Sequence, residues 1–288
     1  MGKLREQMVR EMRVRDFSLR TIEAYVAAVR GVTAHYGRAP DTLTDEEIHA
    51  YLIHLREQRK LSASTCQQIR CGLKFFYDVT LRRPRAALSV PVARQPQKLP
   101  EILSRQEVTR LIESTRTLRY RLLLMATYGG GLRLSEVIHL RHGDLDRERR
   151  LIRIEQGKGK KDRYTLLPAR VIHELDHYVG VYGRPGPWVF GRTTAPEHPL
   201  DPSTPQKVYY AAKLRAGIEK QGGIHALRHA FATHLLEAGT DLPTIQRLMG
   251  HGSITTTMRY LHVTGQLIGQ SISPLDQLVL SDLPPAAP

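Results

Sequence analysis

The sequence predicts a mainly α-helical protein of two domains, the second of which carries a small antiparallel sheet. Three observations support this fold class. Apolar residues recur at helical spacing through the first 80 positions, and a stretch with four prolines, 83–100, interrupts them. Further on, the short apolar segments 151–154 and 163–167 enclose a turn rich in glycine and lysine, which indicates a β-hairpin. A chain of 288 residues is long enough for two such domains.

The first domain, residues 1–82, is expected to consist of four or five packed helices. Ser18 can cap a helix whose apolar residues recur at intervals of three and four. Thr44 begins a capping box ahead of a second apolar series. A further helix is expected to start at Ser64 or Thr65. No strand pattern occurs in this region, so we expect a wholly helical unit.

A proline-rich linker, residues 83–103, is expected to separate this domain from a second one spanning 104–265. Chain segments of that composition form semi-rigid, extended connectors. Ser104 and Glu107 form another capping box at the start of the second domain. The tail, 266–288, holds more apolar surface than a free terminus should show, so we expect it to dock onto a neighbouring protomer. Docking onto its own domain is the alternative.

The charge balance indicates a polyanionic partner. Lys and Arg number 43 against 28 Asp and Glu, which gives a net charge of +15. A merely basic soluble protein is the alternative. No run approaches the roughly 20 apolar residues of a membrane span, and the charged N-terminus lacks the apolar region of a secretory signal. We therefore expect a cytoplasmic protein, nucleoid-associated in a bacterium, with no membrane partner.

Metal and disulfide frameworks are not expected. The two cysteines, Cys66 and Cys71, are five residues apart in a helical pattern, and two are too few for a metal centre. A metal-dependent nuclease would need convergent carboxylates, and the sequence shows no such cluster. We accordingly predict no cofactor.

Several polar residues have the chemistry needed for transferring a phosphodiester to a tyrosine. Arginine stabilises the charge that develops on phosphoryl oxygens, because its planar fork binds two oxygens at once. Arg133 and Arg228 could form such a clamp, and His225 lies on the same helical face as Arg228. A histidine can serve as base for the tyrosine hydroxyl, and Lys158, among other cations, can protonate the leaving oxygen.

Each of these residues also has a plainer interpretation. Arg133 could form a structural salt bridge with Glu136 or Asp144, and a lysine-rich turn is usually only solvated. The histidines could be core, surface or metal-binding residues. Tyr260, near a helix end, could be a packing aromatic with its hydroxyl at the surface.

The order and spacing of four segments resemble the tyrosine recombinases, or phage integrase family. These segments are GLRLSE, GKGKKDR, HALRHAFATHLL and LMGHGSITTTMRY. The similarity covers roughly 104–265, and the helical N-terminal region resembles the family's SAM-like core-binding domain. The sequence looks closest to Xer recombinases and integron integrases. One departure is Gly129-Gly130-Gly131 before Leu132, where the family often has threonine or serine beside glycine.

The resemblance implies a role for six residues. Arg133 and Arg228 would be the phosphate clamp, with His251 as a further hydrogen-bond donor to the transition state. His225 would be the base or proton carrier, and Lys158 the acid. Tyr260 would be the nucleophile that forms a 3′-phosphotyrosyl intermediate, with neither metal nor ATP.

The function expected from this resemblance is site-specific recombination of double-stranded DNA. The protein would work as a homotetramer on two paired sites, with or without a partner recombinase. The alternative is a catalytically silent DNA-binding accessory or regulatory protein of the same fold. The presence of all six polar residues favours the enzyme.

Overall fold

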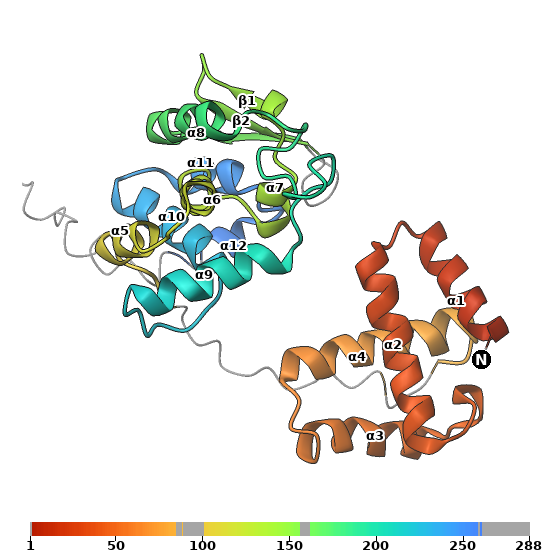
Figure 1. Ribbon diagram of the computed structural model, residues 1–288. Coiled ribbons are helices and arrows are strands. Elements are labelled where there is room, and N and C mark those ends of the chain that lie inside the picture. Colours follow the sequence, from red (N-terminus) through yellow and green to blue (C-terminus); the bar gives the residue numbers. More distant parts are fainter. Residues whose placement is uncertain (1, 85–87, 89–100, 156–161, 259, 261–288) are drawn as a thin grey trace, which may run out of the picture. The chain divides into compact units, whose positions relative to one another are not determined.

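The computed structural model describes residues 2–84, 88, 101–155, 162–258 and 260. The chain forms two compact units, 1–98 and 99–288, and each is described by itself (Figure 1). Most of the expected proline-rich linker and the whole expected tail lie outside the described residues. The mainly helical fold class with a small antiparallel sheet is confirmed.

The N-terminal unit consists of helices around one apolar core. Each helix contributes apolar residues at the spacing that the sequence indicates, and the buried side chains include Met12, Val32, Ile48, Leu73 and Tyr77. The helices are α1 (Gly2–Val14), α2 (Leu19–Tyr36), α3 (Asp45–Glu57) and α4 (Ala63–Phe75), with a 3₁₀ turn η1 (Pro40–Thr42) and a π turn η2 (Phe76–Thr80).

Hydrogen bonds at the helix starts decide where the helices of this unit begin. Ser18 caps α2 by accepting a bond from the backbone of Thr21, and the capping box at Thr44 is present in α3. The expected start of α4 at Ser64 or Thr65 is slightly too late, because the helix begins at Ala63. Ser62 caps the helix, because its hydroxyl accepts the backbone N–H of Thr65 at 3.1 Å.

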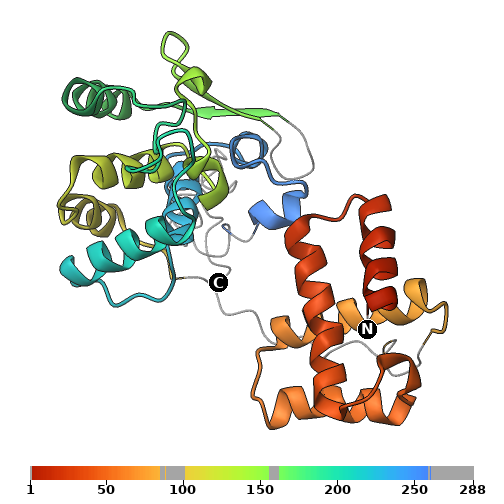
Figure 2. The ribbon, with the colours of Figure 1, turned by 45° about the vertical axis from the view of Figure 1, so that its right-hand side comes forward.

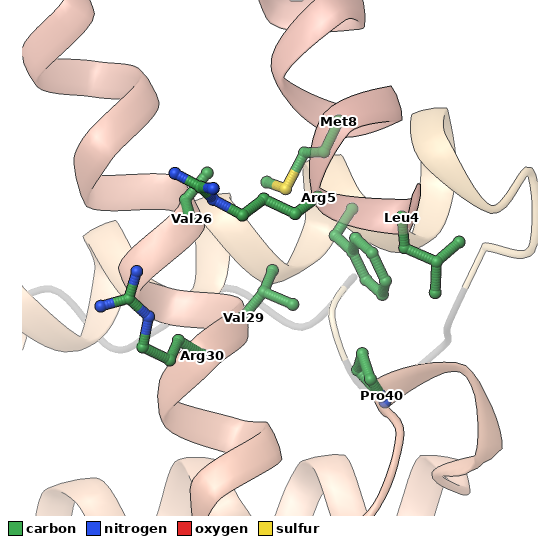
Figure 3. Close-up of a pocket in the computed structure, with 8 residues that line it drawn as sticks. Leu4, Arg5, Met8, Val26, Val29, Arg30 and Pro40 are labelled. Carbon is green, nitrogen blue, oxygen red and sulfur yellow. The ribbon is translucent and has the colours of Figure 1, made fainter. Parts of the chain in front are cut away.

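A small apolar pocket of about 30 Å³ lies between α1 and α2 (Figure 3). Leu4, Met8 and Val29 are among its lining residues. The exposed side chains of Arg5 and Arg30 border it, and Figure 3 shows both guanidinium groups extending to the same side of the pocket. This face of the unit therefore presents two positive charges beside apolar surface.

The second unit packs helices against one side of a three-stranded antiparallel sheet. The strand order is β1-β2-β3, and Ile152 of the central strand pairs with Leu145 and Thr165. The sequence predicts β2 and β3, while β1, only two residues long, is too short to show an alternating pattern. The strands are β1 (Leu145–Asp146), β2 (Leu151–Ile154) and β3 (Arg163–Leu166).

The helices of this unit surround the long buried helix α10 (His225–Glu237). Figure 1 shows α10 among α5 (Arg105–Glu113), α6 (Leu118–Gly129) and α11 (Leu242–Met249), and contacts join it to all three. In Figures 1 and 2 the sheet and α8 lie on one side of the unit, with α9 on the other. The remaining helices are α7 (Leu134–Ile138), η4 (His142–Asp144), α8 (Ala169–Tyr182), α9 (Ser203–Arg215) and α12 (Ile254–Met258).

The helix α10 is buried nearly all round, so its polar residues stand out. Ala226, Leu227, Ala230 and Ala232 belong to the apolar cores on its sides. Among the described residues, no helix has both the length and the apolar character needed to cross a membrane.

Candidate active site

Arg228 is a fully buried arginine, with only 1% of its surface exposed. It extends from the first turn of α10 and donates hydrogen bonds to the backbone carbonyls of Gly131 and Met249. Burial, and then the charge of Arg133, lower the Arg228 pKa to about 9. The guanidinium therefore stays charged at neutral pH, and the two carbonyls hold its plane in one orientation.

Gly131 cannot be replaced by a larger residue without disturbing that orientation. Its φ is +58°, in the left-handed region that favours glycine. A Cβ atom on it would also lie 2.3 Å from the Phe231 ring. Glycine at position 131 thus allows the chain to pass close to α10, and it fixes the carbonyl that Arg228 binds.

Arg133 is held by two partners at the start of α7. Its Nη1 donates to Glu136 Oε1 at 2.7 Å, and its Nη2 donates to the carbonyl of Gly250 at 2.7 Å. The salt bridge with Glu136 that the sequence left open is therefore present, whereas Asp144 accepts the backbone N–H of Arg141 instead. The Arg133 side chain remains 20% exposed, so part of it still faces solvent.

Glu136 is a buried carboxylate shared by several arginines. Arg163 binds it through both terminal nitrogens, at 2.7 and 2.8 Å, and Arg228 lies 3.8 Å away. Burial alone raises the pKa of Glu136, but hydrogen bonds and charge from Arg163 and Arg133 outweigh it and lower the pKa to about 2. The carboxylate is therefore ionised and offsets the charge of the surrounding cations.

Arg163 was not recognised as a site residue from the sequence. It begins β3, directly after the lysine-bearing turn, and only 9% of its side chain is exposed. Besides Glu136 it binds the carbonyl of Leu248 at 3.0 Å. In the sequence, an arginine beside a run of lysines looks like one more solvated residue. The available signal was that alternate residues of a strand point inward, which would have placed Arg163 on the buried face.

His251 lies in the turn after α11. Its Nδ1 shares a hydrogen bond with the Thr257 hydroxyl at 2.9 Å, and its ring stacks on that of Tyr260 with centroids 6.5 Å apart. The preceding Gly250 has a φ of +58°, and a Cβ there would lie 2.6 Å from Arg163 Cδ. The turn is thus packed against the same arginines that bind Glu136.

Tyr260 is buried, with 1% of its surface exposed, and its hydroxyl has a polar partner. The ring packs with Phe231, Ile245 and Met249. Its hydroxyl shares a 2.9 Å hydrogen bond with Nδ1 of His229, a residue to which the sequence assigned no role. The alternative interpretation, a packing aromatic with its hydroxyl at the surface, therefore does not hold. The spacing of four residues from His225, on the same helical face, was the signal available.

His225 is exposed at the start of α10. Its ring meets that of His229 edge to face, with centroids 4.6 Å apart. Lys158 falls within 156–161, outside the described residues, although β2 and β3 on either side of that turn pair through Ile154 and Arg163.

The structure therefore brings five of the six predicted site residues into one connected region. Side-chain contacts lead from Arg133 through Glu136 to Arg228. A second series leads from His225 through His229 to Tyr260, on which His251 stacks. Within the part of the chain that the structure describes, no three His, Cys, Asp or Glu residues gather as metal ligands. This region therefore holds two arginines in fixed orientations and, in the same region, a tyrosine whose hydroxyl is hydrogen-bonded to a histidine.

Two family models match the chain. The model of the phage integrase family covers residues 101–266, and the model of the phage integrase N-terminal SAM-like domain covers residues 4–86. Among curated relatives, an integrase/recombinase of Escherichia coli is 34% identical over 321 residues, covering 96% of this chain and 94% of its own length.

Solved structures of the same fold include two DNA complexes. XerH site-specific recombinase bound to a palindromic difH substrate, a post-cleavage complex, is 23% identical with a TM-score of 0.70, covering 88% of this chain and 79% of its own. A lambda integrase tetramer bound to a Holliday junction is 18% identical with a TM-score of 0.72, covering 90% and 76%. Because the family model spans more than half of the sequence, with the residues of the site inside it, the chain belongs to the phage integrase family, the tyrosine recombinases.

Proposed function

We propose that the protein is a site-specific DNA recombinase that cleaves and rejoins strands through a covalent bond to Tyr260. The observation that carries the proposal is the connected site in which two buried or half-buried arginines and a hydrogen-bonded tyrosine meet. Family membership supports it, as do two solved structures of the same fold, a recombinase in a post-cleavage DNA complex and an integrase on a Holliday junction.

The proposed reaction conserves the energy of the phosphodiester. The Tyr260 oxygen attacks the phosphorus, the bond to the 5′ oxygen breaks, and a 3′-phosphotyrosyl bond forms. The leaving 5′ oxygen takes a proton from Lys158, and a 5′ hydroxyl later reverses the step. Since one phosphate ester is exchanged for another, neither ATP nor a metal is needed.

The proposed role of the arginines follows from the way they are held. Charge grows on the non-bridging phosphoryl oxygens as the pentavalent state forms. Arg133 and Arg228 are oriented by backbone carbonyls and by Glu136 before any substrate arrives, so little reorganisation is needed during the reaction. His251 would add a hydrogen bond to the same oxygens, while His225 would contact the phosphate or carry a proton.

Double-stranded DNA is the proposed partner. The net charge of +15 supports it, and phosphate contacts of that kind make affinity strongly dependent on salt. We propose that residues 1–82 and 104–265 both contact the duplex, that 83–103 link them, and that four protomers join two sites. The tail 266–288 is proposed to dock onto a neighbouring protomer.

The proposal is tested with DNA from both sides of the protein's own gene. Wild type and Tyr260→Phe are incubated with it in EDTA, and adducts that survive SDS are counted. Tyr210→Phe is the matched control, because that tyrosine is 53% exposed on α9. We expect adducts from wild type and the control only. Binding by all three proteins with no adduct from any would instead support the silent accessory protein.

A further inference from the structure

We propose that His229 is a catalytic residue: it receives the hydroxyl proton of Tyr260 as that oxygen attacks the phosphorus. This inference rests on the proposed strand cleavage. It assigns the base to a residue that the sequence did not single out, and it leaves His225 to contact the phosphate.

The contact with the nucleophile is direct. His229 Nδ1 lies 2.9 Å from the Tyr260 hydroxyl, within the distance at which a base removes a proton. The rings are 5.8 Å apart and inclined by 53°, so the imidazole meets the hydroxyl rather than the face of the phenol. Proton acceptance needs the neutral imidazole tautomer with hydrogen on Nε2, which leaves the Nδ1 lone pair directed at the hydroxyl.

The position of His229 on α10 suits this role better than that of His225. His225 is exposed, and His229 is half-buried one turn further along the helix. Because its ring contacts both His225 and the Tyr260 hydroxyl, His229 lies between the two. His225 contacts the His229 ring at 4.6 Å. An exposed donor at a helix start is well placed for a phosphate oxygen, whereas the deeper imidazole is placed for the tyrosine.

The Tyr260 hydroxyl lies in a site that holds a fixed cation. Arg228 binds the carbonyl of Met249, and the Tyr260 ring packs in the same apolar cluster as Met249, so a guanidinium is held near the phenol. Burial of the ring at 1% exposure keeps water from competing for the hydroxyl. A base beside the hydroxyl and a cation near it together lower the barrier to forming the nucleophile.

The step balances as a proton transfer coupled to attack. The Tyr260 O–H bond breaks as its proton passes to His229 Nδ1, and the oxygen's electron pair forms the new P–O bond. The P–O5′ bond breaks, and the 5′ oxygen takes a proton from the acid proposed at Lys158. In the rejoining step, the imidazolium returns its proton to the departing phenolate.

A second histidine–tyrosine pair on the same helix provides a matched control. His234 Nδ1 shares a 2.8 Å hydrogen bond with the Tyr128 hydroxyl, and His234 is 6% exposed. That pair has a hydrogen bond of nearly the same length, but it includes no proposed nucleophile. Substituting His234 therefore measures what loss of a buried histidine–tyrosine bond does to the fold alone.

The test compares single-turnover adduct formation on nicked DNA for wild type, His229→Asn, His229→Gln and His234→Asn. Loss of a general base typically lowers a rate by 10²–10⁴-fold, so we expect a fall of about 10²-fold or more in both His229 variants. DNA affinity should be unchanged, and His234→Asn should react at the wild-type rate per folded molecule. Two different substitutions of His229 are used so that the test still has a result if one of the variant proteins fails to fold.

Replacement of Tyr260 by a fluorinated tyrosine separates a base from a packing residue. Fluorine lowers the phenol pKa, so less help is needed to ionise it, and we expect it to recover at least about tenfold of the rate in His229→Asn. It should give little gain in His225→Asn, where the loss is a phosphate contact. Wild-type rates in the His229 variants, or no recovery with fluorotyrosine, would overturn this inference while leaving the proposed cleavage intact. Absence of adducts from wild type would instead refute the cleavage itself.

Discussion

Arginines in the two units of this protein are held in opposite ways. In the C-terminal unit, Arg228 and Arg163 are 1% and 9% exposed at the side chain and are bound on several sides by carbonyls and by Glu136. In the N-terminal unit, Arg5 and Arg30 extend into solvent beside a small apolar pocket. The same type of side chain thus serves either as a fixed part of the fold or as an exposed surface charge.

The difference in burial determines what each set of arginines can contribute to DNA binding and to catalysis. A buried guanidinium keeps one orientation, so it can stabilise charge that exists only in a transition state. An exposed one adapts to many phosphates and supplies affinity that salt screens. Substitutions in the two units should therefore affect different measurements.

The largest effect is expected for Arg228→Lys. An ammonium group cannot bind the carbonyls of Gly131 and Met249 and also present a planar fork, so strand cleavage should slow by roughly 10²–10³-fold. DNA affinity at low salt should change by less than about threefold, because the charge is conserved. Single-turnover adduct formation at saturating DNA measures the rate. A rate within threefold of wild type would show that the fork is not needed.

Next in size is the loss of stability expected for Glu136→Gln. Without the carboxylate, Arg133, Arg163 and Arg228 lose their shared counter-charge, which should cost about 3 kcal/mol or more of unfolding free energy. The matched control is Asp176→Asn, which breaks the exposed pair with Arg147 and should cost less than about 1 kcal/mol. Urea unfolding measures both, and equal losses would contradict the distinction between buried and exposed pairs.

The pH dependence of stability should report the same carboxylate. The Glu136 pKa is about 2 in the folded protein and near its ordinary 4.5 when unfolded, so its contribution is complete above pH 4.5 and disappears as the pH falls toward 2. That contribution corresponds to roughly 3 kcal/mol. Unfolding free energy measured from pH 6 down to about pH 2.5 should therefore fall more steeply for wild type than for Glu136→Gln. If the unfolding free energies of wild type and Glu136→Gln fell in parallel with pH, Glu136 would not be the carboxylate responsible.

The smallest effect is expected for Arg30→Ala in the N-terminal unit. Arg30 is exposed, and the proposed DNA contact of residues 1–82 makes it a candidate for binding one phosphate. Its removal should then weaken DNA binding a few-fold and reduce the salt slope by about 1. The cleavage rate at saturating DNA should not change. Fluorescence anisotropy at several salt concentrations measures the slope, and a lowered saturated rate would mean that the surface charge has a catalytic role.

Local sequence patterns predicted much of this fold. The capping boxes at Thr44 and Ser104 are present where expected, because their hydrogen bonds join residues only three positions apart. The start of α4 was misplaced because Ser62 and Ser64 are equivalent caps in a sequence, and only the bond to Thr65 distinguishes them. The strand β1 was missed because a strand of two residues is too short to show the alternation of apolar and polar residues.

The candidate site was predictable as a set of residues and not as a set of contacts. Motif spacing led to Arg133, Arg228, His251 and Tyr260. The carbonyls that Arg133 and Arg228 bind, however, lie 117 and 97 positions away in sequence. Glu136 bridging to Arg163 joins positions 27 apart, and His229 meets Tyr260 across 31. Such pairs depend on how α7, α10 and β3 pack, and no periodicity encodes that.

The glycine at position 131 matters when the activity of related proteins is judged from their sequences. A side chain there would push against Phe231 and turn away the carbonyl that Arg228 binds, while leaving every polar residue of the site in place. A copy of this gene could therefore decay into an inactive protein through one apolar change. Surveys that judge a related recombinase competent from its polar site residues alone would count such a copy as active, so the glycine belongs among the positions inspected.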